Sequence, residues 1–216
     1  MSLFIVFEGP EGSGKTTQME LLQQALEKAG VATTRTREPG GTPIGEQIRE
    51  VLHDRNNREM LPLTEALLYS AARAQHVAEV IRPALDRGEV VICDRYATST
   101  LAYQGYGHGL DLDMLRAITD WATEGLYPDL IVYLDLDVRC GLERKRQALR
   151  GGQDGWNRME EQAIAFHQAV RRGYLCMARS EPARWLIVDA SKPVDAVQQQ
   201  IWQCIKEKLA ERRSQG

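Results

Sequence analysis

The segment Gly9-Pro10-Glu11-Gly12-Ser13-Gly14-Lys15-Thr16 constrains this chain more than any other part of it. It matches the pattern G-x-x-x-x-G-K-[ST] without a mismatch, directly after an apolar run and at the start of an amphipathic one. Glycines in such a turn let backbone N–H groups point inward at a helix N-terminus, where they bind phosphate oxygens. The sequence therefore predicts a strand, a phosphate-binding loop and a helix, in that order.

Three side chains have the chemistry to bind a nucleoside triphosphate together with its metal. Lys15 can reach the β and γ phosphates, and the hydroxyl of Thr16 can ligate Mg²⁺. The apolar run at 90–93 delivers Asp94 to the carboxyl end of a predicted strand, where open parallel sheets bind their ligands. Asp94 can therefore hold Mg²⁺ through a water molecule, and ATP with Mg²⁺ is the expected ligand.

Two features argue against a guanine-nucleotide switch. The sequence contains no Asn-Lys-x-Asp motif, and Asp94 is followed by Arg95 and Tyr96 rather than by the D-x-x-G of a GTPase. A motor or assembly ATPase would usually need a longer chain than these 216 residues and a partner surface. A small ATP-dependent enzyme is favoured.

Composition limits the number of domains, the partners and the cellular location that such an enzyme can be expected to have. With 43% apolar residues the chain can fill one substantial core, which predicts a single domain over residues 1–216. Its formal net charge of -3 predicts neither a nucleic-acid nor a membrane partner. The four cysteines form no C-x-x-C pair, so neither a zinc site nor a disulfide framework is expected. The first residues lack the charged start of a signal peptide, and a cytoplasmic location is expected.

Short apolar, β-branched runs alternate with longer amphipathic stretches along the whole chain. Because these runs are apolar throughout, we expect an α/β fold with a parallel sheet that helices cover on both faces. Pro83 predicts a kink or a break near the end of the third helix. The expected strands are 3–7, 31–36, 90–93, 130–134 and 185–188; the expected helices are 16–29, 44–53, 64–86, 111–124, 139–149, 159–178 and 194–213.

One segment interrupts the alternation. Residues 150–157 contain three glycines between two helical patterns that are rich in arginine. An ordinary surface connection would have the same composition, but the three glycines favour a mobile loop.

Several spaced motifs together resemble the thymidylate kinase family, and the similarity covers almost the whole chain. No single one of the later motifs is decisive, but their order and spacing are similar to this family. The motifs are EGPEGSGKTT at 8–17, TREPGGT at 36–42, ARAQ at 72–75, DRY at 94–96 and STLAYQG at 99–105.

This resemblance implies a P-loop NTPase fold, a five-stranded parallel sheet in the order 2-3-1-4-5, and a homodimer. Apolar helix positions such as Leu67, Leu68 and Ala71 are candidates for the dimer contact, although core packing explains them equally well. The implied reaction transfers the γ-phosphate of ATP, bound with Mg²⁺, to dTMP and yields dTDP.

The resemblance also implies roles in binding dTMP. Arg37, Arg49 and Arg95 would converge on the monophosphate, which needs forked and permanently charged donors. Tyr69 stands where the family usually has a phenylalanine stacking on thymine, and its ring keeps the π-face. Arg73 would donate to O4 of the base, Thr100 and Gln104 would meet the N3 side, Tyr103 would pack against the deoxyribose, and Glu11 would approach the 3′-hydroxyl. The implied site comprises Glu11, Arg37, Glu38, Pro39, Arg49, Tyr69, Arg73, Arg95, Ser99, Thr100, Tyr103 and Gln104.

The resemblance also implies a mobile lid at about 144–158. The ATP site and this lid follow the family less closely than the dTMP site does. Here no variable position of the phosphate-binding loop is basic, which resembles the family class whose lid arginines close over ATP. The lid is longer than usual and ends in Asn157-Arg158-Met159-Glu160, so the register of its arginines stays open among Arg144, Lys145, Arg146, Arg150 and Arg158. Arg146 or Arg150 would act in the transition state with Lys15 and Arg95, and Arg144 would pack near adenine. The implied ATP site comprises Gly9, Pro10, Glu11, Gly12, Ser13, Gly14, Lys15, Thr16, Thr17, Arg144, Ser191 and Lys192, with Thr16 and Asp94 at the metal.

Two other functions stay open at this point. A P-loop kinase that acts on another small acceptor would share the same ATP site. A regulatory nucleotide-binding module would bind ATP but would form ADP no faster when dTMP was added.

Overall fold

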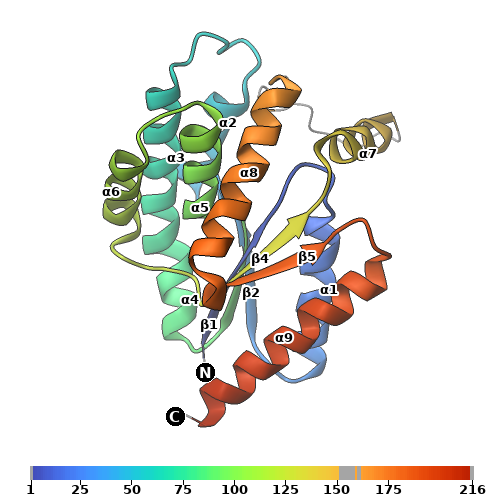
Figure 1. Ribbon diagram of the computed structural model, residues 1–216. Coiled ribbons are helices and arrows are strands. Elements are labelled where there is room, and N and C mark those ends of the chain that lie inside the picture. The colour runs from blue at the N-terminus through green and yellow to red at the C-terminus, as the bar shows by residue number, and fades with distance from the viewer. Residues whose placement is uncertain (1, 151–158, 160–161, 215–216) are drawn as a thin grey trace.

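The computed structural model describes residues 2–150, 159 and 162–214. Its centre is one parallel sheet of five strands in the order β2-β3-β1-β4-β5, which confirms the predicted α/β fold and strand order (Figure 1). The strands are β1 (Leu3–Glu8), β2 (Thr33–Arg37), β3 (Val90–Asp94), β4 (Leu130–Asp135) and β5 (Trp185–Asp189). All five expected strands are present, and their bounds differ from the prediction by at most two residues.

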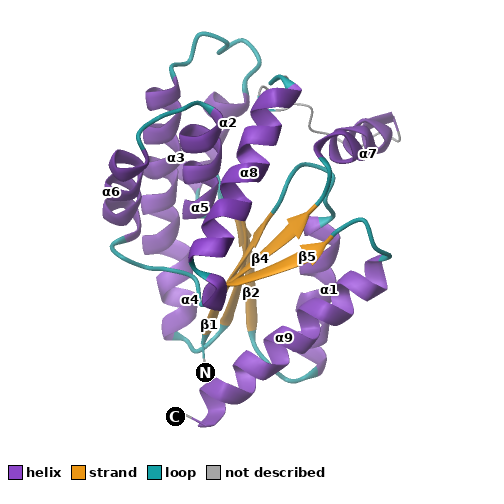
Figure 2. Cartoon of the chain, viewed as in Figure 1, coloured by secondary structure: helices purple, strands orange, loops and turns teal. Residues whose placement is uncertain are grey.

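Helices cover both faces of the sheet (Figure 2). The long helices are α1 (Lys15–Lys28), α2 (Pro43–His53), α3 (Pro62–His76), α6 (Leu112–Thr123), α7 (Val138–Arg150), α8 (Ile164–Ser180) and α9 (Val194–Ser214). The shorter helical segments are η1 (Val77–Ile81), α4 (Arg82–Asp86), α5 (Ala97–Thr100), η2 (Leu101–Gly107) and η3 (Pro182–Arg184).

The central strand β1 explains why the sheet is covered on both sides. All six of its residues are buried. Leu3, Ile5 and Phe7 pack with apolar residues of α1 and α9, whereas Phe4 and Val6 pack with residues of η1, α4 and α5. Successive side chains of a strand point to opposite faces, so the unbroken apolar run Leu3–Phe7 requires a helix layer on each side.

The helix predicted over 64–86 is helical throughout, but not in one uniform form. It starts at Pro62, and the five residues of η1 form a π-helical turn directly before α4, whose second residue is Pro83. Proline has no amide hydrogen and crowds the preceding turn, and a wider turn at this point accommodates both effects. The predicted interruption near Pro83 therefore takes the form of this π-helical turn.

Two expectations about helices are wrong. The segment 97–107 was not expected to be helical, yet it forms α5 followed by the π-helical η2. Its β-branched residues and glycines have low helix propensity, and its first turn is fixed by tertiary bonds, since Thr98 and Ser99 each donate a hydrogen bond of 2.7 Å to the carboxylate of Glu8. The helix expected from Met159 begins at Ile164, and Met159 lies in a turn.

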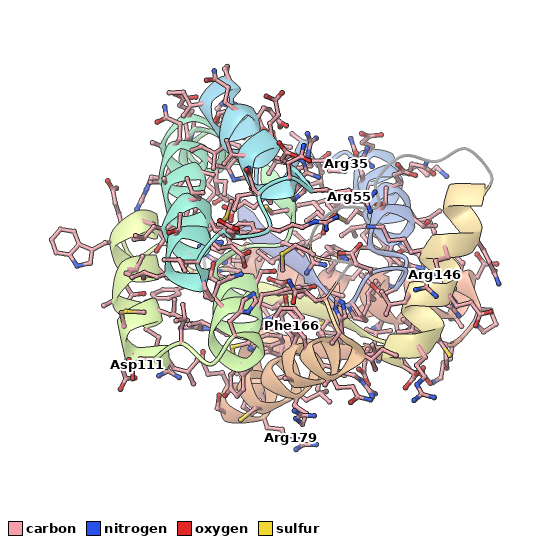
Figure 3. The ribbon with its side chains drawn as sticks, turned by 90° about the horizontal axis from the view of Figure 1, so that it is seen from above. Arg35, Arg55, Asp111, Arg146, Phe166 and Arg179 are labelled. Carbon is pink, nitrogen blue, oxygen red and sulfur yellow. The ribbon has the colours of Figure 1, made fainter. Side chains whose placement is uncertain are left out.

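The four cysteines are free thiols. Among the described residues, no helix combines the length and the apolar character that crossing a membrane requires. Figure 3 looks down on the molecule from above, with α7 and its Arg146 at one side and α6, near Asp111, at the other. The candidate site lies at this end, where the parallel strands finish.

Candidate functional site

A cavity of about 720 Å³ opens at the carboxyl ends of the strands. It begins at the phosphate-binding loop and continues to the inner side of α3 and η2, so a single space joins both halves of the predicted site. Its lining residues are Glu11, Gly12, Ser13, Gly14, Lys15, Thr16, Thr17, Arg37, Glu38, Pro39, Arg49, His53, Tyr69, Arg73, Asp94, Arg95, Tyr96, Ser99, Thr100, Tyr103, Gln104, Arg144, Lys145 and Met159.

The phosphate-binding loop has the predicted geometry. Gly14 adopts a left-handed conformation with φ of 89° and caps α1, which starts at Lys15. The ammonium of Lys15 folds over the loop and donates to the carbonyl oxygens of Gly9 at 3.2 Å and Pro10 at 3.4 Å. The carbonyl oxygens of Gly9 and Pro10 thus hold the ammonium of Lys15 in place, although neither residue lines the cavity.

A glycine pair places α7 beside this loop. A Cβ atom on Gly12 would lie 2.2 Å from the carbonyl oxygen of Gly141, and a Cβ on Gly141 would lie 2.3 Å from the carbonyl oxygen of Glu11. Only glycine permits so close a backbone approach. The contact sets Arg144 and Lys145, one turn further along α7, against the cavity.

Glu11 is the meeting point of the cations at this end of the cavity. Its carboxylate accepts from Arg95 at 2.6 Å and from Lys145 at 3.0 Å. Burial by itself would raise the pKa of Glu11, but the positive charges of Lys15, Arg95 and Lys145 lower that pKa well below its usual value. Burial and the nearby Arg95 lower the pKa of Lys15, because a second cation disfavours its charged form. We call Glu11, Lys15, Asp94, Arg95 and Lys145 the phosphate end.

Asp94 and Thr16 offer oxygen atoms that fit a magnesium ion. The Oδ1 atom of Asp94 is buried and has no hydrogen-bond partner among the described residues. Thr16 is exposed in the first turn of α1, and both residues line the cavity. Mg²⁺ prefers carboxylate and hydroxyl oxygens, and it is usually bound through few protein ligands together with phosphate oxygens. A buried carboxylate oxygen without a donor is therefore the chemistry expected of a protein group beside Mg²⁺.

Arg95 is held in a conformation that few arginines adopt. Its φ of 67° lies in the left-handed region, which costs energy for any residue with a side chain. The surrounding structure fixes it: its amide donates to Phe7 at 2.9 Å, its guanidinium donates to Glu11, and the guanidinium lies 5.0 Å from the ring centroid of Tyr103. Arg95 lines the cavity in this strained conformation.

Behind Arg95 lies a fully buried carboxylate, that of Glu8. It accepts from the hydroxyls of Thr98, Ser99 and Tyr174 at 2.7, 2.7 and 2.6 Å. Tyr174 comes from α8, so this network ties α8 and α5 to the end of β1. Ser99 lines the cavity, but its hydroxyl is already bonded within this network.

Two further arginines, Arg37 and Arg49, line the cavity near the end of β2. Arg37 lies opposite Asp94 in the sheet register, and its guanidinium donates to both carboxylate oxygens of Glu46 at 2.9 Å. Arg49, on α2, donates to the carbonyl oxygen of Pro39 at 2.9 Å. The structure thus brings both arginines to the cavity, as the sequence predicts.

Arg73 is the most completely buried basic residue of the cavity wall, with 1% of its surface exposed. It donates to Glu38 at 2.7 Å, to the hydroxyl of Thr100 at 3.0 Å and to the carbonyl oxygen of Tyr96 at 3.1 Å. His76, on the next turn of α3, lies 3.1 Å from the other carboxylate oxygen of Glu38. Glu38 therefore lines the cavity mainly as the group that orients Arg73.

The remaining predicted residues of this end are Tyr69, Thr100, Tyr103 and Gln104, which with Arg73 we call the base end. All five line the cavity. Gln104 is buried and donates from its amide nitrogen to Glu65 at 2.6 Å. Thr100, Tyr103 and Gln104 come from α5 and η2, the helical segments that sequence patterns did not predict. π-helical turns recur at functional sites, and this one carries two of the five residues.

The predicted lid and adenine residues divide into two groups. Arg144 lines the cavity and donates at 3.1 Å to the carbonyl oxygen of Ala190, in the loop expected to meet adenine. Ser191 and Lys192 in that loop are exposed and do not line the cavity, and the hydroxyl of Ser191 donates to Asp189 at 2.6 Å. Arg146 is exposed on α7 outside the lining (Figure 3). Arg150 closes α7, but the structure does not describe its side chain, and Arg158 lies outside the described residues.

Sequence reasoning missed three residues of the lining: His53, Tyr96 and Met159. His53 is the last residue of α2. Its spacing of four residues from Arg49 on α2 was the available signal, since such residues share one helix face. The approach of Tyr96 and Met159 depends on tertiary contacts that no local pattern encodes.

Comparison with known proteins gives consistent matches over nearly the whole chain. The family model of thymidylate kinase matches residues 7–201. A thymidylate kinase of Deinococcus radiodurans is 54% identical over 206 residues, which cover 95% of this chain and 97% of that protein. One of Roseiflexus castenholzii is 50% identical over 218 residues, covering 97% and 95%. The crystal structure of thymidylate kinase from Ehrlichia chaffeensis is similar at a TM-score of 0.75 and 32% identity, covering 94% of this chain and 98% of that one.

Proposed function

This chain belongs to the thymidylate kinase family, and we propose that its cavity binds dTMP at the base end and ATP with Mg²⁺ at the phosphate-binding loop. The protein is a nucleoside monophosphate kinase that transfers the γ-phosphate of ATP to dTMP, giving dTDP and ADP. The observation that carries the assignment of the site is the single cavity that runs from Lys15 to Gln104. In-line phosphoryl transfer requires the two substrates to meet end to end in one space.

At the base end, thymine stacks on the ring of Tyr69, and Arg73 donates to its O4 atom. A guanidinium carries five N–H donors, and Arg73 needs only part of them for its three protein acceptors. Tyr103 packs against the deoxyribose and leaves no room for a 2′-hydroxyl. Thr100 and Gln104 meet the N3 side of the base.

Arg95 of the phosphate end binds the monophosphate of dTMP together with Arg37 and Arg49, which lie near the end of β2. Forked guanidinium groups suit a doubly charged phosphate because two parallel N–H donors match two of its oxygens. The bonds that these arginines now make to Glu11, Glu46 and Pro39 are bonds to oxygen acceptors, which phosphate oxygens can replace. Glu11 then accepts a hydrogen bond from the 3′-hydroxyl of the sugar.

The ATP phosphates bind along the loop, where backbone N–H groups and Lys15 surround them. Thr16 and Asp94 hold Mg²⁺, which when bound neutralises charge on the β and γ phosphates. Arg144 lies near adenine because it reaches the carbonyl oxygen of Ala190. Ser191 and Lys192 lie in the same loop, whose backbone groups contact adenine.

We assign a lid to about 144–158 within a single domain, with Arg146 or Arg150 supplying positive charge to the transferring phosphoryl group. The support is the position of α7, which the Gly12–Gly141 contact holds against the phosphate-binding loop. A contact made mainly in the transition state affects kcat rather than KM. Replacing each arginine by alanine, singly and together, identifies which of them acts. If all three variants have the kcat of the wild type, another residue supplies the charge.

A homodimer in the cytoplasm completes the proposal. Helix α3 contacts both α2 and α6, and each of the three exposes a large apolar side chain: Leu67 is 49% exposed, Ile44 is 51% exposed and Trp121 is 86% exposed. Figure 1 places α3 and α6 together on the side away from α1 and α9. An apolar face on adjoining helices favours association with a second copy. Sedimentation at micromolar concentration, with Leu67→Asp as the comparison, distinguishes a dimer from a monomer.

The experiment that tests the assignment of the site is a coupled assay of ADP formation with ATP, Mg²⁺ and each of the four deoxynucleoside monophosphates. Turnover should be highest with dTMP, and Asp94→Asn should shift the Mg²⁺ dependence to higher concentrations while Asp86→Asn, on the exterior of α4, leaves it unchanged. An unchanged Mg²⁺ dependence in Asp94→Asn would remove Asp94 from the metal site.

A further inference from the structure

We propose that Glu65 is a specificity-determining positioning residue, which holds Gln104 so that the amide oxygen of Gln104 faces the nucleotide base. Glu65 lies on α3, is 1% exposed and accepts a hydrogen bond of 2.6 Å from Nε2 of Gln104. Gln104 lines the cavity, whereas Glu65 does not, so the carboxylate lies behind the amide. The inference rests on the proposed binding of the base beside Gln104.

The carboxylate of Glu65 determines whether the nitrogen or the oxygen of the Gln104 amide faces the cavity. An ionised carboxylate only accepts hydrogen bonds, so at 2.6 Å it requires the amide nitrogen of Gln104. The reverse orientation would bring two oxygen acceptors together inside the protein, where water cannot screen their repulsion. The amide oxygen is therefore the end of Gln104 that a ligand in the cavity meets.

A second side chain, His108, also approaches Glu65. The ring nitrogen Nε2 of His108 lies 3.5 Å from the same carboxylate oxygen that Gln104 contacts. Glu65 sits in the first turn of α3 and Gln104 in η2, and these two helical elements pack against each other. Neither side chain can turn without losing its partner, so the orientation is built into the fold.

This orientation matches one class of pyrimidine and opposes another. Thymine and uracil carry a hydrogen at N3, which the amide oxygen of Gln104 accepts. Cytosine carries a lone pair at N3, which the same oxygen repels. Arg73 adds the complementary requirement, because its guanidinium can only donate and so matches the O4 carbonyl of thymine. Glu38 orients Arg73, and Glu65 orients Gln104. These two buried carboxylates thus determine that the base meets a donor at Arg73 and an acceptor at Gln104, although neither carboxylate contacts the base.

The test replaces Glu65 by glutamine, which has the same shape but can present either an oxygen or a nitrogen to Gln104. Gln104 can then rotate, and the preference for dTMP over dCMP in kcat/KM should fall on the order of 10-fold. The preference for dTMP over dUMP should stay unchanged, because both bases have the same N3 hydrogen. Each preference is a ratio measured in one sample, so partial loss of folded enzyme does not affect it.

Two further variants make the result specific. Glu27→Gln is the matched control, since the exposed Glu27 accepts from Nε2 of Gln23 at 2.9 Å in the same kind of pair, and both ratios should keep their wild-type values. The exchange Glu65→Gln with Gln104→Glu should regain the preference over dCMP, because the new carboxylate at 104 bonds to the amide at 65 and still offers an accepting oxygen to the base.

Other results would overturn the inference. An unchanged dTMP-to-dCMP ratio in Glu65→Gln, an equal fall in the dTMP-to-dUMP ratio, or an exchange variant that fails to regain the ratio would each show that Glu65 acts only in packing. If Glu65→Gln cannot be purified, the ratio in the exchange variant decides alone. Failure of the proposed site would look different, because the wild type itself would then lack a preference for dTMP.

Discussion

At the base end of the cavity, Arg73 donates to three acceptors of the protein itself, whereas at the phosphate end Arg95 and Lys145 bond to the single carboxylate of Glu11 and Lys15 lies close by. Four of the five residues of the base end are buried, and Arg73 and Gln104 each bond to a carboxylate of their own. The phosphate end is more exposed to solvent at Glu11, Arg95 and Lys145, and it places three cations close to one carboxylate. The two ends thus prepare for their ligands by different means.

The difference follows from what each end must recognise. A base is read by the direction of a few hydrogen bonds, so its readers gain from being fixed in advance, and a fixed side chain loses little freedom on binding. A phosphate is recognised by charge, which requires several cations near one point and a low energy for exchanging their partner. Glu11 provides that partner at the position where the cations meet.

The largest effect is expected at the phosphate end, from Lys15→Ala. Loss of the ammonium removes positive charge from the β and γ phosphates, so kcat for ADP formation with dTMP should fall on the order of 10³-fold. The matched control is Lys28→Ala, which changes an exposed lysine in the last turn of the same helix. Turnover near that of the wild type would show that the phosphate end is not where catalysis occurs.

The variant Arg95→Lys tests whether binding at the phosphate end requires the two parallel N–H donors of a guanidinium or only a positive charge. Lysine keeps the positive charge but cannot donate two parallel hydrogen bonds, so kcat/KM for dTMP should fall about 10²-fold. Arg87→Lys is the control, because Arg87 is exposed and pairs with Glu89 at 2.6 Å away from the cavity. If both variants have the same kinetics, charge alone suffices, and Arg95 does not bind the monophosphate through its guanidinium.

At the base end, Arg73→Ala should lower the activity with dTMP and remove most of its preference over dCMP. The lost preference in kcat/KM should be about 10-fold to 100-fold, since a charge-assisted hydrogen bond to O4 is lost. Alanine also leaves Glu38 buried without its arginine, so Arg73→Lys, which keeps a cation there, is the second variant. An unchanged preference in both variants would make Arg73 a structural residue and leave the base to other readers.

The smallest effect is expected from Glu11→Gln, and it depends on pH. The folded protein has a depressed pKa at Glu11, so the carboxylate contributes stability above its unfolded pKa of about 4.3, and this is lost as pH falls through the folded pKa. Near pH 7 the variant should be less stable by about 1 kcal/mol, or about 2–4 °C in Tm. Thermal unfolding of wild type and variant should show the two melting curves approaching each other at low pH. A difference that is constant with pH would mean that Glu11 does not hold the cations.

Sequence patterns identified two residues of the phosphate end, Lys15 and Asp94, together with the neighbouring Thr16, but none of the base end. Lys15, Thr16 and Asp94 occupy positions that a strand, a turn and a helix dictate locally, and the structure places all three in the cavity. The residues at the base end were identified only through family resemblance, since Thr100, Tyr103 and Gln104 lie in a segment whose helical form local propensity did not predict. Glu65 and His76 gave no sequence signal, because both lie on α3 behind the cavity and act on other side chains.

The sequence by itself determined the alternation of strands and helices, the phosphate-binding loop and the positions of its charged residues. Each of these depends on neighbours within a few positions, through apolar periodicity, glycine conformation and the end of a strand. Only the tertiary structure decided which carboxylate each cation meets: Glu38 reaches Arg73 across 35 residues, Glu65 reaches Gln104 across 39, and Glu11 reaches Lys145 across 134. A hydrogen bond depends on distances of a few tenths of an ångström between atoms far apart in the chain, and packing of the helices on the sheet sets those distances.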